Sequence, residues 1–91
     1  MDTKKFIDLC KEIIKDYVNS HIEETGEKDL KEIDNEAIFV VWSCKTLQNN
    51  KALLSTTVPD LMYYECTYNG DKQEIYFDAY KKILNKAIKV E

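Results

Sequence analysis

The chain has 91 residues, a net charge of −4, 44% hydrophobic and 33% charged residues, two glycines and one proline. This composition predicts a single globular domain over residues 1–91 and argues against a disordered or multidomain chain. All basic residues are lysines, and arginine is the usual side chain for bidentate recognition of phosphate and guanine. Nucleic acid is therefore not the expected partner.

The first predicted element is an amphipathic helix over residues 3–24. Asp2 or Thr3 can cap its start, and Gly26 can end it. Apolar side chains recur at steps of three and four residues, which places them on one helical face. These are Phe6, Ile7, Cys10, Ile13, Ile14, Tyr17, Val18 and Ile22.

Residues 27–36 hold five acidic residues and two lysines. We expect an acidic connector here, in which Leu30 and Ile33 could fix a helical turn to the domain. Whether this segment is helical stays open at the level of sequence.

Residues 37–77 change to a pattern typical of strands and predict an antiparallel meander. Four strands are expected, over residues 37–47, 52–58, 62–68 and 73–77. The predicted tight turns are Asn49-Asn50 and Asn69-Gly70.

A two-residue Asn69-Gly70 turn also predicts which residues face each other. Tyr64 would lie opposite Ile75 and Met62 opposite Phe77 on the core face. On the other face, Tyr63 would lie opposite Tyr76 and Glu65 opposite Glu74. The first strand is apolar on both faces as far as Trp42, so either the Phe39/Val41 set or the Ile38/Val40/Trp42 set must point away from the helices.

A second helix is predicted over residues 78–90, with Asp78 as its cap. Its apolar face would consist of Tyr80, Ile83, Leu84, Ala87 and Ile88. The expected fold is therefore α+β, in the order α-β-β-β-β-α, with both helices on one face of a four-stranded sheet.

No catalytic motif is present, so we expect no enzyme and no catalytic residue. Cys44 has Lys45 beside it, but neighbouring strand residues point to opposite faces, and Lys45 is poorly placed to activate the thiol. Cys10 and His21 would lie about 16 Å apart along one helix, too far to share a zinc ion. No metal or cofactor is expected.

The odd number of cysteines and the absence of CxxC predict reduced, mostly buried thiols. No signal peptide and no apolar run of membrane-spanning length is recognisable. The predicted location is the cytoplasm.

Four lysines gather near the C-terminus: Lys81, Lys82, Lys86 and Lys89. Their position on a terminal helix is loosely similar to double-stranded-RNA-binding domains, whose Gly-rich lead into that helix is missing here. We prefer the interpretation that these lysines stabilise the C-terminal end of the predicted helix, where positive charge interacts favourably with the helix dipole.

The block VWSCKTLQNNKALL, residues 41–54, resembles the hallmark of an uncharacterised family of small proteins. Members of that family are encoded by phages and prophages of low-GC Gram-positive bacteria. The segments at residues 63–65, 68–71 and 78–82 are also similar to the family's pattern. The resemblance implies action inside a host cell but implies no particular activity.

The leading hypothesis is a non-catalytic phage accessory protein that binds a host macromolecule in the host cell cytoplasm. Counter-defence is one role that such binding could serve. A small-ligand or nucleotide-binding module and a self-assembling structural phage protein are the alternatives. The expected partners are a host or phage protein and a second copy of the chain, most simply in a dimer, with no membrane. The candidate interaction face comprises Phe39, Val41, Trp42, Lys45, Gln48, Asn49, Asn50, Tyr63, Glu65 and Tyr76.

Overall fold

The computed structural model of the chain describes residues 1–25 and 32–90, apart from the side chains of residues 22–25. Helix α1 spans Thr3–Thr25 and is followed by a short 3-10 turn, η1, at Asn35–Ala37. Four strands follow, β1 Ile38–Thr46, β2 Asn49–Thr56, β3 Met62–Asn69 and β4 Glu74–Lys81. The predictions about Gly26 and residues 27–31 of the acidic connector lie outside the described residues.

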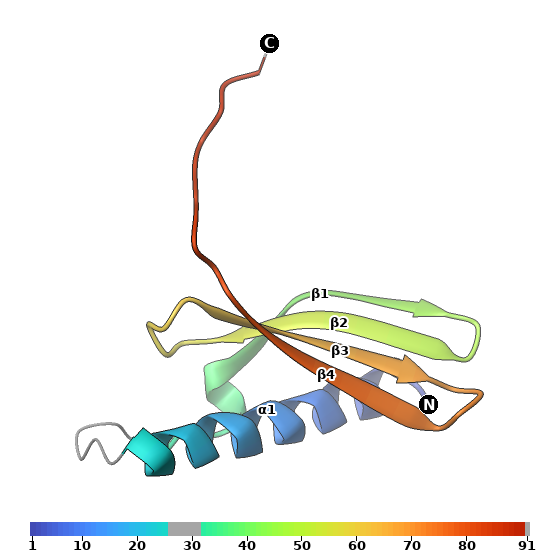
Figure 1. Ribbon diagram of the computed structural model, residues 1–91. Helices are drawn as coiled ribbons and strands as arrows, with labels where there is room; N and C mark the ends of the chain where they lie inside the picture. Colours follow the sequence, from blue (N-terminus) through green and yellow to red (C-terminus); the bar gives the residue numbers. More distant parts are fainter. Residues whose placement is uncertain (26–31, 91) are drawn as a thin grey trace.

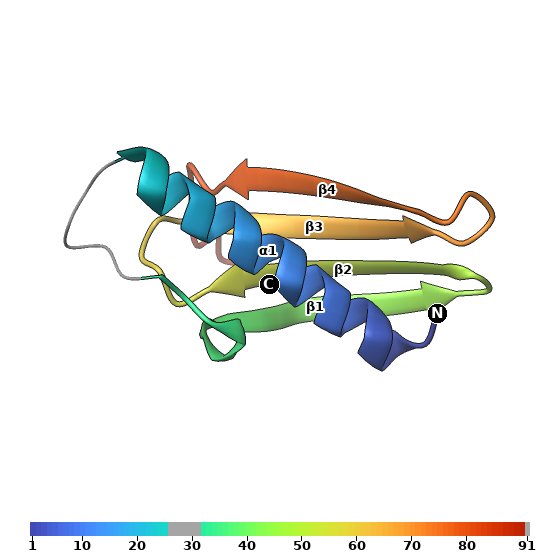
Figure 2. The ribbon, with the colours of Figure 1, turned by 90° about the horizontal axis from the view of Figure 1, so that it is seen from below.

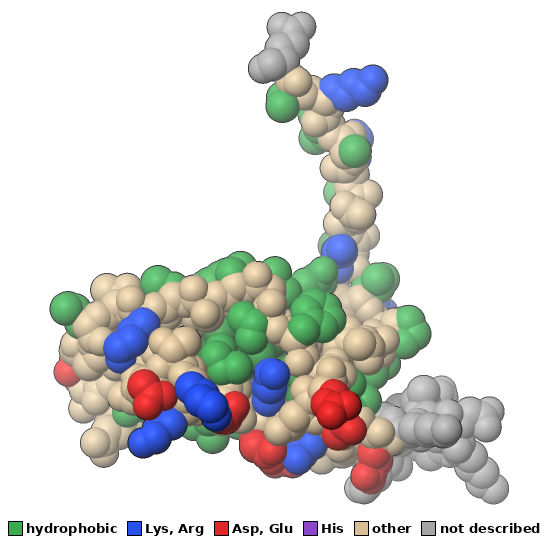
Figure 3. Space-filling view, turned by 180° about the vertical axis from the view of Figure 1, so that it is seen from behind, with side chains coloured by type: hydrophobic (Ala, Val, Ile, Leu, Met, Phe, Trp, Pro, Cys, Tyr) green, Lys and Arg blue, Asp and Glu red, His purple; other side chains and the backbone are tan. Residues whose placement is uncertain are grey.

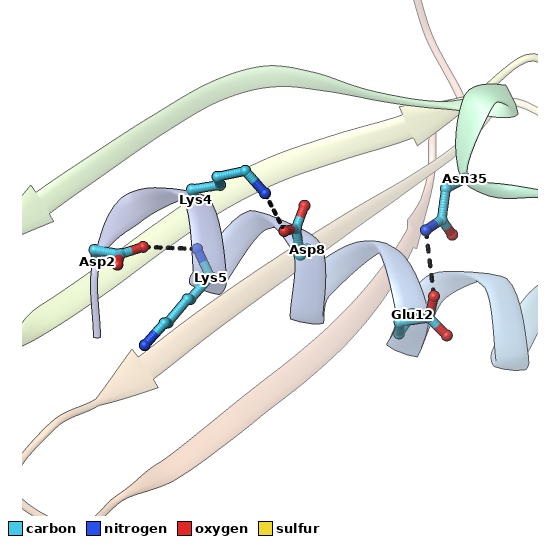
Figure 4. Close-up of polar contacts among 6 residues, drawn as sticks. All are labelled: Asp2, Lys4, Lys5, Asp8, Glu12 and Asn35. Atoms are coloured by element: carbon cyan, nitrogen blue, oxygen red, sulfur yellow. Dashed lines mark hydrogen bonds and ion pairs between the residues drawn. The ribbon is translucent and has the colours of Figure 1, made fainter.

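Helix α1 begins as the sequence predicts. The backbone N–H of Lys5 donates to Asp2 Oδ1 at 2.8 Å, which satisfies one of the unpaired donors of the first turn (Figure 4). This hydrogen bond is the main cause that lowers the pKa of Asp2. Farther along the helix, Glu12 accepts a hydrogen bond of 3.2 Å from Asn35, so the segment that leads into β1 is fixed to α1.

The strands form one antiparallel sheet in the order β1-β2-β3-β4. Helix α1 lies against one face of this sheet (Figure 1) and runs diagonally across the strands (Figure 2). Among the described residues, α1 therefore covers one face of the sheet and leaves the other face open.

The core lies between α1 and this covered face. It is formed by four residues of α1 and five of the sheet: Phe6, Cys10, Ile14, Val18, Ile38, Ala52, Leu54, Tyr64 and Cys66. Tyr17 extends the core toward β4, because its ring meets the rings of Tyr64 and Phe77 edge-on at 5.8 and 5.3 Å between centroids. Aromatic pairs favour this geometry.

The predicted C-terminal helix is wrong. Strand β4 continues to Lys81, and residues 82–90 run on without helix or strand. Up to Lys81 the residues pair with β3 and alternate between the two faces of the sheet, as in a strand. Phe77 and Ala79 lie toward α1, while Asp78 and Tyr80 lie on the opposite face. Beyond Lys81 a short helix would need packing contacts to be stable, and Ile83, Leu84 and Ile88 are 74–92% exposed.

Both predicted hairpin turns are displaced. The turn between β3 and β4 comprises residues 70–73, so Tyr64 lies opposite Ala79, not Ile75. The shift is four residues, an even number, and therefore every side chain keeps its predicted face. The first turn is formed by Leu47 and Gln48, with Leu47 at a φ of 55°, and not by Asn49-Asn50.

Candidate protein-binding face of the sheet

We call the side of the sheet that is turned away from α1 the outer face. Every strand contributes to it, because alternate residues of each strand point away from the helix. Its apolar members are Phe39, Trp42, Leu53, Tyr63, Tyr76 and Tyr80. Its polar members are Cys44, Thr46, Asn49, Lys51, Ser55, Glu65, Thr67, Asn69, Glu74 and Asp78.

A β-bulge in β1 brings two large side chains to this face. Val40 lies opposite Leu54 on the helix side, whereas Trp42 lies opposite Leu53 on the outer side. Val41 is the extra residue between them, and one extra residue reverses the faces of those that follow. Neither predicted set stays together, since Phe39 and Trp42 both point outward.

The aromatic side chains lie in two groups, one on β1 and one on β3 and β4, and Leu53 of β2 lies between them. Tyr63 on β3 lies directly opposite Tyr80 on β4. Phe39, Trp42, Tyr76 and Tyr80 remain 43–51% exposed. Four aromatic side chains that are each about half exposed present about 400 Å² of apolar surface. Exposed patches of this size are often functional.

Charged groups lie between these rings and are largely paired. Lys51 Nζ lies 3.3 Å from Glu65 Oε1, and the Tyr76 hydroxyl donates to Glu74 Oε2 at 2.8 Å. The second contact raises the pKa of Tyr76. With Asp78 included, the outer face carries three carboxylates and one lysine, and its own field is negative.

The structure divides the predicted interaction face. Phe39, Trp42, Tyr63, Glu65 and Tyr76 share the outer face. Val41 sits at the bulge.

Of the remaining predicted residues, Asn49 lies at the end of the outer face, two residues before Lys51, and Lys45, Gln48 and Asn50 lie off it. Lys45 points to the helix side, where its Nζ donates to the Met1 carbonyl at 2.8 Å, and Asn50 is buried on that same side. Gln48 and Asn49 instead join the two hairpins, through Gln48 Nε2 to Asp71 Oδ1 and Gly70 N–H to Asn49 Oδ1.

Sequence reasoning missed two apolar members of the outer face. Leu53 follows from strand alternation, because Ala52 and Leu54 are buried on the helix side and Leu53 must point the other way. Tyr80 was hidden by its assignment to a helix that does not form.

The thiols differ in their surroundings. Cys10 and Cys66 are buried in the core, and a hydrogen bond between them, together with burial, raises the pKa of Cys10. Cys44 is exposed on the outer face, so the expectation of a buried thiol is wrong at this position. Its Sγ lies 3.6 Å from Thr46 Oγ1, and Lys45 points to the other side of the sheet.

Among the described residues, no three His, Cys, Asp or Glu side chains lie close enough together to hold a metal ion. A hollow of about 200 Å³ lies where residues 82–85 leave the sheet beside Leu61, which is below the usual size of small-molecule sites. No helix among the described residues is both long and apolar enough to cross a membrane.

Residues 7–90 match a family described as a family of unknown function, DUF6275. The chain belongs to the DUF6275 family. Comparisons with curated proteins and with solved structures found no match. The match begins at Ile7, in the second turn of α1, and includes the whole sheet and the segment up to residue 90. The outer face of this DUF6275 protein therefore lies entirely within the matched residues.

Proposed function

We propose that this DUF6275 protein is a non-catalytic binding protein that engages protein partners through the outer face. The observation that carries the proposal is the aromatic surface formed by Phe39, Trp42, Tyr63, Tyr76 and Tyr80 on the side that α1 leaves open. Protein interfaces are enriched in aromatic residues at their centre and polar at their rim. Glu65, Glu74 and Asp78 supply polar groups between and beside the rings.

The setting that we propose is the cytoplasm of a bacterial host, with the protein acting as a phage or prophage accessory factor, for example in counter-defence. The resemblance of residues 41–54 to small phage-encoded proteins supports this setting. The partner class is protein rather than nucleic acid, because the outer face is acidic and a phosphate backbone would be repelled.

Affinity capture with a matched control tests the proposal. The double variant Trp42→Ser/Tyr76→Ser removes two exposed rings, one from each edge strand of the outer face, whereas Leu47→Ser removes an exposed apolar side chain from a hairpin turn outside it. We expect the double variant to lose the proteins that the wild type retains from host cells, and Leu47→Ser to retain them.

Circular dichroism checks that both variants fold. Equal retention by the wild type and the double variant would refute the outer face as the binding surface. Turnover of a substrate by the wild type, at a rate that the double variant leaves unchanged, would refute the proposal that the protein is non-catalytic.

A further inference from the structure

The segment after β4 is the second unburied apolar feature of the molecule. In residues 82–90, Ile83, Leu84, Ile88 and Val90 are 74–92% exposed. The segment leaves the sheet on the side opposite α1 (Figure 1). Hydrophobic side chains of the body gather along the side from which it leaves, and apolar and lysine side chains follow each other along the segment (Figure 3).

The segment and the outer face are complementary in charge. Residues 82–90 contain three lysines and no acidic residue, while the outer face carries Glu65, Glu74 and Asp78 against one lysine. Within the chain, Lys82 Nζ lies 5.5 Å from the centroid of the Tyr63 ring on the outer face. A lysine in this position is attracted by the ring face.

The segment cannot readily fold back onto its own sheet. The backbone N–H of Lys82 donates to the Leu61 carbonyl at 2.8 Å, which fixes the exit from β4. A return across the outer face would require a reversal of the chain, and residues 82–90 contain neither glycine nor proline and one asparagine, Asn85, as their single turn-forming residue.

We infer that residues 82–90 of one copy cover the outer face of a second copy, and that the exchange is reciprocal in a two-fold dimer. This inference rests on the proposed function and names the partner that the face receives. Two-fold pairing gives two identical contacts from one complementary pair of surfaces.

The area suffices for a stable dimer. A nine-residue extended segment exposes about 1,500 Å². If a third of this surface is buried in each copy, with a similar area on each outer face, the total is about 2,000 Å². Stable interfaces have this size.

Sedimentation equilibrium of three proteins and one mixture tests the exchange. The tail variant carries Ile83→Ser, Leu84→Ser and Ile88→Ser, and the face variant carries Trp42→Ser and Tyr76→Ser. We expect the wild type to be a dimer at micromolar concentration and each variant to dimerise at least about 100-fold more weakly. Leu47→Ser should dimerise like the wild type.

The mixture gives the decisive result. The face variant retains an intact tail and the tail variant an intact face, so together they should form a one-to-one heterodimer through one of the two contacts. A monomeric wild type, a tail variant that remains a dimer, or a mixture that stays monomeric would each overturn the exchange. If the exchange fails while the face variant still loses captured proteins, the proposed function stands without it.

Discussion

Asn50 is the one buried side chain whose amide has no hydrogen-bond partner among the described residues. An unpaired buried amide costs about 1–3 kcal/mol. We therefore expect Asn50→Leu to raise the free energy of unfolding by about 1 kcal/mol or more in urea titrations. No effect or a loss would mean that the amide is paired in solution.

Asn19 provides the matched control for this change. Its amide donates to the Ile33 carbonyl at 3.2 Å and accepts from the Ile33 N–H at 2.9 Å. Asn19→Leu removes both contacts, and we expect it to lower the free energy of unfolding by about 1–3 kcal/mol.

Gly70 is required by a close approach between the two hairpin turns. A Cβ at this position would lie 2.2 Å from the Gln48 carbonyl oxygen, so alanine would force the turns apart. We expect Gly70→Ala to lower the free energy of unfolding by about 1–3 kcal/mol. Thermal unfolding measures this loss, and an unchanged melting temperature would show that the turns do not touch in solution.

Tyr64 should make stability depend on alkaline pH. Burial, with a smaller contribution from Asp60, raises the pKa of its hydroxyl from 10.0 to about 12. The folded state therefore binds the proton more tightly, and this stabilisation is complete below pH 10 and lost as the pH rises toward 12.

Tyr64→Phe isolates this contribution from the titration of the lysines. Denaturant titrations between pH 9 and 12 should show a shallower loss of stability in Tyr64→Phe than in the wild type, by up to about 2–3 kcal/mol. Parallel pH profiles of the two proteins would contradict the assignment.

At the level of elements, the helix α1, the presence of four strands and the faces of the residues paired in β3 and β4 follow from hydrophobic periodicity and alternation. The bulge at Val41 does not, because β1 is apolar on consecutive residues and either alternation fits its sequence. Because of this bulge, Phe39 and Trp42 share the outer face, although the two predicted sets had placed them on opposite faces.

The end of β4 shows a second limit of sequence reasoning. Residues 78–88 carry a helical apolar stripe, but Tyr80 pairs with Tyr63 across the sheet. Pairing along the open edge of β3 is a tertiary effect that overrides local propensity. The outer face could thus be predicted in part: Leu53 follows from alternation once the helix side of β2 is known, and Tyr80 became visible only with the register of β4.

At the level of the whole molecule, the Cα radius of gyration is 15.0 Å, whereas a compact domain of this length would have about 12 Å. The excess reflects residues 82–90, which extend away from the body (Figure 1). Residues 82–90 and the outer face are both apolar and do not cover each other within one copy, so each is free to contact a second copy.

Trp42, the single tryptophan of the chain, lies on the outer face at 43% exposure and reports directly on whether a second copy covers it. As concentration rises through the micromolar range, its fluorescence should shift to shorter wavelength and become less accessible to iodide. The tail variant should keep the emission of an exposed indole throughout. An exposed, concentration-independent Trp42 in the wild type would contradict the account.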